Sequence, residues 1–92
     1  MKKYEGMFII KSDLSKENFD KTIGQINDAI VKNGGSVSAA KELGKQRLSF
    51  PIKKYKEGIY YLVNFDIDTD AISKIKRAVS LNESILRALI VK

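Results

Sequence analysis

The sequence contains no cysteine, no histidine and no tryptophan, and only one proline among its 92 residues. Without cysteine and histidine, disulfides, thiol nucleophiles, zinc-finger ligand sets and imidazole acid–base catalysis are excluded. We therefore expect no enzyme, no metal site and no cofactor. No apolar run approaches the roughly 20 residues of a membrane span, and the run after the first lysines is too short for a signal peptide. The sequence predicts a cytoplasmic protein with one domain over residues 1–92.

The net charge of +6 is concentrated in three segments of the chain. Residues 1–11 carry +2, residues 41–57 carry +4 and residues 74–92 carry +4, whereas residues 58–73 carry −3. Clusters of positive charge are typical of proteins that bind a polyanion such as a nucleic acid. A lysine-rich protein without such a partner explains the charge equally well, so charge alone does not decide between the two.

Apolar periodicity predicts the element order strand, helix, strand, strand, helix, strand. Strands are expected at residues 4–10, 36–50, 59–65 and 85–91, with a bulge at Gly44 and a charged turn over residues 53–58. One helix follows an N-cap at Ser15 and stops at residues 33–35; the other follows an N-cap at Asp68 and ends near Ser80. This βαββαβ order predicts a ferredoxin-like α+β sandwich, with a four-stranded antiparallel sheet and two helices on one face.

The face of the sheet without helices is predicted to carry apolar side chains. Alternation along the strands directs one set toward the helices: Tyr4, Phe8, Ile10, Tyr61, Val63, Phe65, Leu86, Ala88 and Ile90. The outward set then contains Met7, Ile9, Tyr60, Leu62, Leu89 and Val91. An exposed apolar patch of this kind indicates a protein partner. A bulge in one strand would reverse the assignment for that strand.

Other functional interpretations find less support in the sequence. Asp66, Asp68 and Asp70 could ligate a hard cation, but acids between a strand and a helix more often cap that helix. An acylphosphatase-type hydrolase would use Arg47 and Asn64, yet no glycine-rich loop joins them. The third strand lacks most of the RNA-recognition signature, and Tyr61 and Phe8 fall on the helix side, where they could not stack bases. A ferredoxin-like module that binds a protein or a metabolite without RNA remains an alternative.

Residues 42–54 (ELGKQRLSFPIKK), followed by Glu57-Gly58 and a Tyr-Tyr-Leu strand, resemble the bacterial small-subunit ribosomal protein S6 family. The opening MKKYE and residues 82–87 (NESILR) fit the same family, so the resemblance covers essentially the whole chain. It implies a structural protein with the βαββαβ fold and no catalytic activity. It also implies binding to small-subunit ribosomal RNA in the central domain (platform), as a heterodimer with ribosomal protein S18.

The resemblance also implies a set of RNA-facing residues, which are Lys2, Lys3, Tyr4, Arg47, Lys53, Lys54, Lys56 and Arg87. Gly6 departs from the family pattern, since a branched apolar residue is expected at that point of the first strand. We expect this glycine to lower stability through lost packing and greater chain entropy in the unfolded state.

Overall fold

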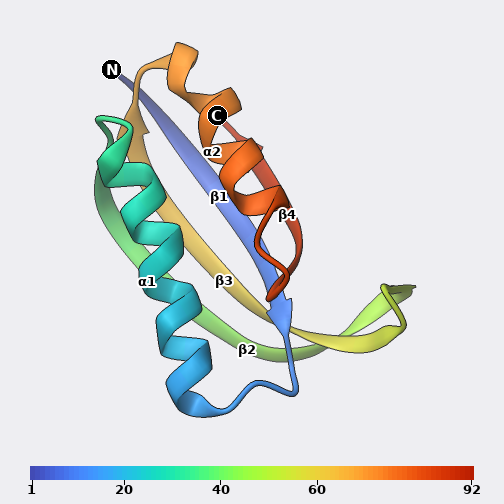
Figure 1. The fold of residues 1–92 in the computed structure, drawn as a ribbon. Helices are drawn as coiled ribbons and strands as arrows, with labels where there is room; N and C mark the ends of the chain where they lie inside the picture. The colour runs from blue at the N-terminus through green and yellow to red at the C-terminus, as the bar shows by residue number, and fades with distance from the viewer.

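The computed structural model describes all residues 1–92, and its elements follow the predicted order. The strands form one antiparallel sheet in the order β2-β3-β1-β4, and both helices lie on the same side of it (Figure 1). The predicted ferredoxin-like α+β fold is confirmed. Neither helix has the length and apolar character needed to cross a membrane. The elements are β1 (Lys2–Lys11), α1 (Lys16–Lys32), β2 (Ser36–Ile52), β3 (Tyr55–Ile67), a 3-10 turn (Thr69–Ala71), α2 (Ile72–Ser80) and β4 (Ile85–Val91).

Helix α1 begins and ends through local hydrogen bonds that the sequence predicted. At its start, Ser15 Oγ accepts a hydrogen bond from the Asn18 N–H at 3.2 Å. At its end, Gly34 adopts a φ of 88°, and the Gly35 N–H donates to the Ile30 carbonyl at 2.9 Å. This left-handed ending satisfies carbonyls that the last turn leaves free. Both predicted caps are confirmed.

The hydrophobic core lies between the helices and one face of the sheet. In β1 and β3, the side chains that alternation directed inward are buried, as predicted. The pairing of β4 with β1 shifts its register between Ile9 and Ile10 of β1. As a result, Ile85 lies in the central cluster, whereas Leu86 is buried outside that cluster. The cluster consists of Tyr4, Phe8, Ile10, Ile26, Ile30, Tyr61, Val63, Phe65, Ile67, Ile75, Val79 and Ile85.

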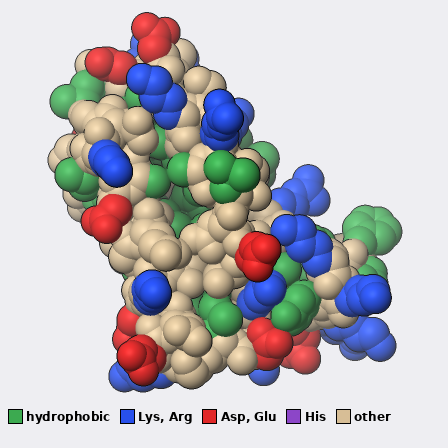
Figure 2. All heavy atoms as spheres, in the orientation of Figure 1, with side chains coloured by type: hydrophobic (Ala, Val, Ile, Leu, Met, Phe, Trp, Pro, Cys, Tyr) green, Lys and Arg blue, Asp and Glu red, His purple; other side chains and the backbone are tan.

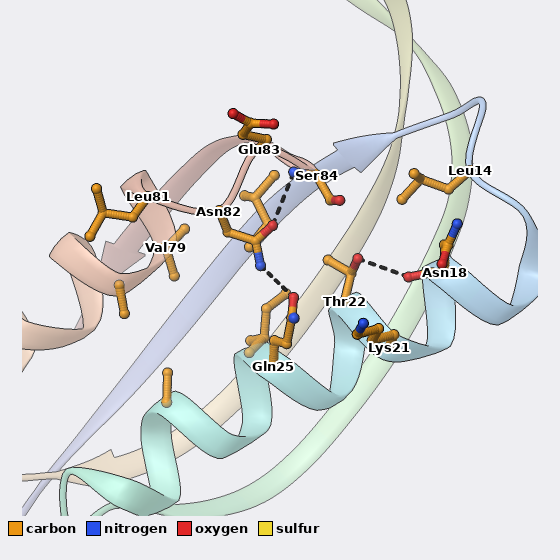
Figure 3. A pocket seen from close by; sticks show the side chains of 14 residues that line it. Leu14, Asn18, Lys21, Thr22, Gln25, Val79, Leu81, Asn82, Glu83 and Ser84 are labelled. Carbon is orange, nitrogen blue, oxygen red and sulfur yellow. Dashed lines mark hydrogen bonds between the residues drawn. The ribbon is translucent and has the colours of Figure 1, made fainter.

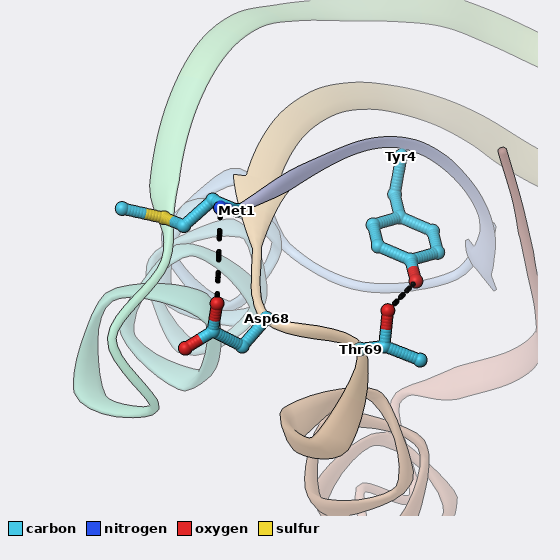
Figure 4. Close-up of polar contacts among 4 residues, drawn as sticks. All are labelled: Met1, Tyr4, Asp68 and Thr69. Atoms are coloured by element: carbon cyan, nitrogen blue, oxygen red, sulfur yellow. Dashed lines mark hydrogen bonds and ion pairs between the residues drawn. The ribbon is translucent and has the colours of Figure 1, made fainter.

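The start of the second helix differs from the prediction. Asp68 does not cap through its side chain; its carboxylate lies 3.9 Å from the Met1 ammonium group (Figure 4). A full positive charge attracts a carboxylate more strongly than the partial charge at a helix end. The Asp68 carbonyl accepts instead from the Ala71 N–H at 3.0 Å, which forms a 3-10 turn before α2 begins at Ile72. No three acidic side chains gather here as metal ligands.

The β2–β3 hairpin is longer and tighter than predicted. Strand β2 continues through Pro51 to Ile52, which pairs with Tyr55, so Lys53 and Lys54 alone form the turn. Their φ values of 49° and 72° define a type I′ turn, which favours Asn-Gly and strains other residues. The predicted bulge at Gly44 is confirmed by a φ of 86° and a local register shift. Register shifts bend a strand, and the hairpin projects from the body at the lower right of Figure 1.

Candidate functional site

The sheet face opposite the helices carries an apolar surface, which we call the open-face patch. Strand register puts its members in neighbouring rows: Met7 lies between Leu62 and Leu89, and Ile9 lies opposite Tyr60. Leu89 is 58% exposed and Val91 is 45% exposed. The predicted grouping of residues therefore exists, while its role as a partner surface stays a prediction. The patch comprises Met7, Ile9, Tyr60, Leu62, Leu89 and Val91.

One apolar residue near the open-face patch was not predicted. Leu48 of β2 is only 8% exposed, although it lies outside the central cluster. A Cβ atom on Gly58 would lie 2.5 Å from Ile9 Cγ2 and 3.7 Å from Leu48 Cδ2. The bare glycine therefore gives Ile9 the room it occupies, with Leu48 close by. Sequence alternation missed Leu48 because the register of β2 shifts at several points before it.

The hairpin carries the densest group of predicted RNA-facing residues, namely Arg47, Lys53, Lys54 and Lys56. Lys and Arg side chains gather over the projecting hairpin in Figure 2. The only ion pair within 4.0 Å in the chain joins Met1 and Asp68, so no lysine or arginine of the hairpin has an acidic side chain at that distance. These cations are consequently free to interact with an external polyanion.

Tyr55 fixes the hairpin against the body of the protein, a role the sequence did not reveal. Its hydroxyl donates a hydrogen bond to Asp13 Oδ2 at 3.0 Å, in the loop between β1 and α1. Lys11 Nζ lies 5.6 Å from the centre of the Tyr55 ring, within the range of a cation–π contact. The only feature of the sequence that could have pointed to this role of Tyr55 is its place as an aromatic residue within a run of lysines.

Replacing Tyr55→Phe should loosen the hairpin without unfolding the protein. The change removes one exposed hydrogen bond, so we expect a loss of about 0.5–1 kcal/mol in unfolding free energy. Amide hydrogen exchange of residues 52–56 should accelerate. Tyr60→Phe is the matched control, because its hydroxyl makes no hydrogen bond within the protein. Equal exchange rates in both variants would contradict the anchoring role of Tyr55.

The structure places Tyr4 in the core, as alternation predicted, so little of its side chain is open to the RNA contact that the resemblance implied, and that contact stays a prediction. Tyr4 is 8% exposed and its ring stacks on Phe65 with centroids 6.0 Å apart. Its hydroxyl lies 2.9 Å from Thr69 Oγ1, in a hydrogen bond between the two hydroxyls (Figure 4). With its hydroxyl engaged and its ring covered, Tyr4 stabilises the junction of β1 and the 3-10 turn.

The remaining predicted RNA-facing residues fall into two groups at opposite ends of the sheet. Lys2 and Lys3 begin β1, and alternation points them to opposite faces. Arg87 lies opposite Ile9, toward the hairpin end. The two ends are separated by about 20–25 Å, at roughly 3.3 Å per strand residue. The structure thus brings Arg87 toward the hairpin and leaves Lys2 and Lys3 apart.

The residues considered for a hydrolase do not converge. Arg47 lies opposite Glu57, whereas Asn64 lies opposite Glu5 and Ala39 further along β3. Seven residues of extended strand between Glu57 and Asn64 span on the order of 20 Å. A phosphate group bound by Arg47 could therefore not reach Asn64 at the same time.

A hollow of about 680 Å³ lies between α1 and the turn that joins α2 to β4 (Figure 3). Its amides bond to each other: Asn82 Nδ2 donates to Gln25 Oε1 at 2.6 Å, and the Ser84 N–H donates to Asn82 Oδ1 at 3.0 Å. The Thr22 hydroxyl donates to a carbonyl of its own helix. These polar groups tie the turn to α1 and are not directed at a ligand.

Comparisons with known proteins agree on one family. The family model described as ribosomal protein S6 matches residues 3–92. The chain is 36% identical to small ribosomal subunit protein bS6 of Halalkalibacterium halodurans, over 100% of this chain and 97% of that protein. Identity to the bS6 of Gloeobacter violaceus is 37%, over 98% and 94% of the two chains. The crystal structure of 30S ribosomal protein S6 from Thermotoga maritima, 22% identical, has a TM-score of 0.90 over 97% of this chain and 84% of its own, which shows the shared fold.

Proposed function

Because this chain belongs to the ribosomal protein S6 family, we propose that it binds small-subunit ribosomal RNA through its basic hairpin and ribosomal protein S18 through its open-face patch. Members of this family are structural proteins of the small ribosomal subunit, not enzymes, which places the chain in the cytoplasm as part of the ribosome. The RNA contact and the partnership with S18 are the two parts of the proposal.

The observation that carries the RNA contact is the set of unpaired cations on the projecting hairpin. Arg47, Lys53, Lys54 and Lys56 lie on one arm, and none has an acidic side chain within 4.0 Å. Such cations neutralise phosphates and release condensed counterions, which drives binding and makes it dependent on salt. Base stacking on the sheet is disfavoured, because Tyr61 lies on the helix side and is 6% exposed. The proposal therefore assigns phosphate contacts, and not base stacking, to this protein.

The open-face patch supports the protein contact. Its apolar side chains cover three adjacent strands, and Leu89 and Val91 at its edge are well exposed. Apolar surface of this kind gains free energy when a partner removes it from water. RNA, with its charged backbone, is a poor cover for such a surface, whereas a protein partner suits it.

Both parts are tested by titrating the protein against a fragment of small-subunit ribosomal RNA, with and without S18. We expect weak, salt-sensitive binding by this chain alone and much tighter binding when S18 is present. Equally tight binding without S18 would contradict the joint arrangement. If the RNA does not bind with or without S18, the proposal is wrong.

A charge placed in the open-face patch should separate S18 binding from folding. We expect Leu89→Lys to weaken S18 binding at least tenfold, because an interface centre tolerates an unpaired charge poorly. Val31→Lys on α1 is the matched control, since Leu89 and Val31 are 58% and 59% exposed. Calorimetric titration of each variant with S18 measures the effect. Equal loss of affinity in both variants would show that S18 does not bind the patch.

A further inference from the structure

A groove of about 300 Å³ lies where the hairpin turn, the end of α2 and the beginning of β4 meet. Each of the three elements contributes one cation, namely Lys53, Lys76 and Arg87, and no acidic residue lines the groove. Its full lining is Lys53, Lys76, Val79, Ser80, Ile85, Leu86, Arg87 and Ala88.

The bend of the hairpin is what assembles this groove. Lys53 is far from Lys76 and Arg87 in sequence, and it lines the same groove because the bent hairpin brings its turn to the end of the sheet where α2 ends and β4 begins. The Tyr55–Asp13 hydrogen bond holds the arm close to that position. Lys53 belongs to a tight two-residue turn, so its backbone position is well defined. The groove is therefore a product of the fold and not of adjacent residues in the chain.

The charge of the groove distinguishes it from the other basic end of the sheet. There, Lys3 and Lys92 line a hollow together with Glu5 and Asp66, so acids offset the cations. In the groove, three cations stand without an acid, above an apolar floor that includes Val79 and Ile85. Apolar walls lower the local dielectric constant and strengthen the field on an anion.

Resting on the proposed function, we propose that this groove binds a backbone phosphate of the RNA and that Lys76 of α2 is one of its contacts. Arg87 can donate two parallel hydrogen bonds to the phosphate oxygens, while Lys53 and Lys76 add further positive charge. Lys76 lies outside the set that the resemblance implied. Its assignment extends the RNA surface from the hairpin and β4 onto the helix.

The test compares Lys76→Gln with Lys74→Gln in binding to the ribosomal RNA fragment in the presence of S18. Both lysines are exposed on α2, but residues two apart on a helix point in different directions, and Lys74 does not line the groove. We expect Lys76→Gln to weaken binding by roughly three- to tenfold and to lower the log–log salt slope by about 1. Lys74→Gln should stay within about twofold of the unchanged protein, because a non-contacting charge is largely screened.

Two results would contradict the assignment of the groove as a phosphate site while leaving the proposed function in place. Equal losses for the two variants would show a diffuse charge effect and not a phosphate site. An unchanged affinity for Lys76→Gln, when loss of Lys53 and Lys54 still weakens binding, would show that the RNA bypasses the groove. If the unchanged protein fails to bind the RNA at all, both the groove and the proposed function fall.

Discussion

Replacing the turn by Lys53→Asn together with Lys54→Gly is expected to weaken RNA binding on the order of 10–100-fold at 0.1 M salt while making the protein more stable. If each lysine contacts one phosphate, its loss lowers the log–log salt slope by about 1, which corresponds to about tenfold at that salt concentration. Asn-Gly is the preferred pair for a type I′ turn, whereas both lysines hold positive φ values. Relief of that strain should add about 1–2 kcal/mol to the free energy of unfolding.

Opposite signs of the two effects make this variant informative. A loss of affinity caused by unfolding would come with a lower urea midpoint, and here the midpoint should rise. The control is Lys21→Gln with Lys32→Gln, which removes two charges from α1 at a distance from the hairpin. An unchanged salt slope in the turn variant would show that neither lysine contacts phosphate.

Replacing Gly6→Val is expected to destabilise the protein by about 3 kcal/mol, the upper end of the usual cost of overpacking a core. A Cβ on Gly6 would lie 2.8 Å from Phe8 Cε2 and 3.3 Å from Phe65 Cε1. Phe8 is 0% exposed, so its ring is enclosed by the core and can move only if its neighbours move too. From sequence, Gly6 was expected to lower stability through lost packing; because the Phe8 ring already lies where a side chain would go, the structure leads us to expect the opposite effect.

Urea denaturation of Gly6→Val and Gly24→Ala gives a matched comparison. Nothing lies within 4 Å of a Cβ on Gly24, which is in the middle of α1. That substitution should therefore stabilise by about 0.5–1 kcal/mol through helix propensity alone. Adding Phe8→Leu to Gly6→Val should recover part of the loss, since the smaller side chain vacates the contested space. A stable Gly6→Val protein without that second change would refute the steric account.

Most of the fold could be predicted because local patterns and tertiary packing agree. The stripe of Phe19, Ile23, Ile26 and Ile30 faces the sheet, and the alternation in β1 and β3 sorts the core from the open face correctly. The resemblance based on residues 42–54 is confirmed by the family match. These predictions succeed because the 3.6-residue and 2-residue periods are strong where an element is regular.

Predictions failed or stayed incomplete where a contact distant in sequence decides the structure. Asp68 turns toward the Met1 ammonium and does not cap α2 through its side chain, and the hydroxyl of Tyr4 bonds to Thr69, although alternation had already placed the Tyr4 ring in the core. No local pattern encodes either contact. Register shifts in β2 and at the start of β4 likewise determine where Leu48 and Leu86 lie, and they depend on the neighbouring strand.

In the candidate site, too, local patterns predicted some features, whereas others depend on contacts between residues that are distant in sequence. The six members of the open-face patch followed from alternation, because β1, β3 and the end of β4 are regular. The approach of Lys76 to Lys53 and Arg87 could not be predicted, since it depends on the direction in which the hairpin bends. Sequence indicated which residues are cationic, and only the fold shows which of them share a groove.

The central claim, that RNA and protein bind to different surfaces of this domain, is tested most directly by NMR chemical-shift mapping. The ribosomal RNA fragment is added first and S18 second, and amide and methyl signals are followed. We predict that RNA shifts the signals of residues 53–56 and 76–87, and that S18 shifts those of Met7, Leu62 and Leu89. RNA-induced shifts centred on the open-face patch, or S18-induced shifts confined to the hairpin, would contradict the account.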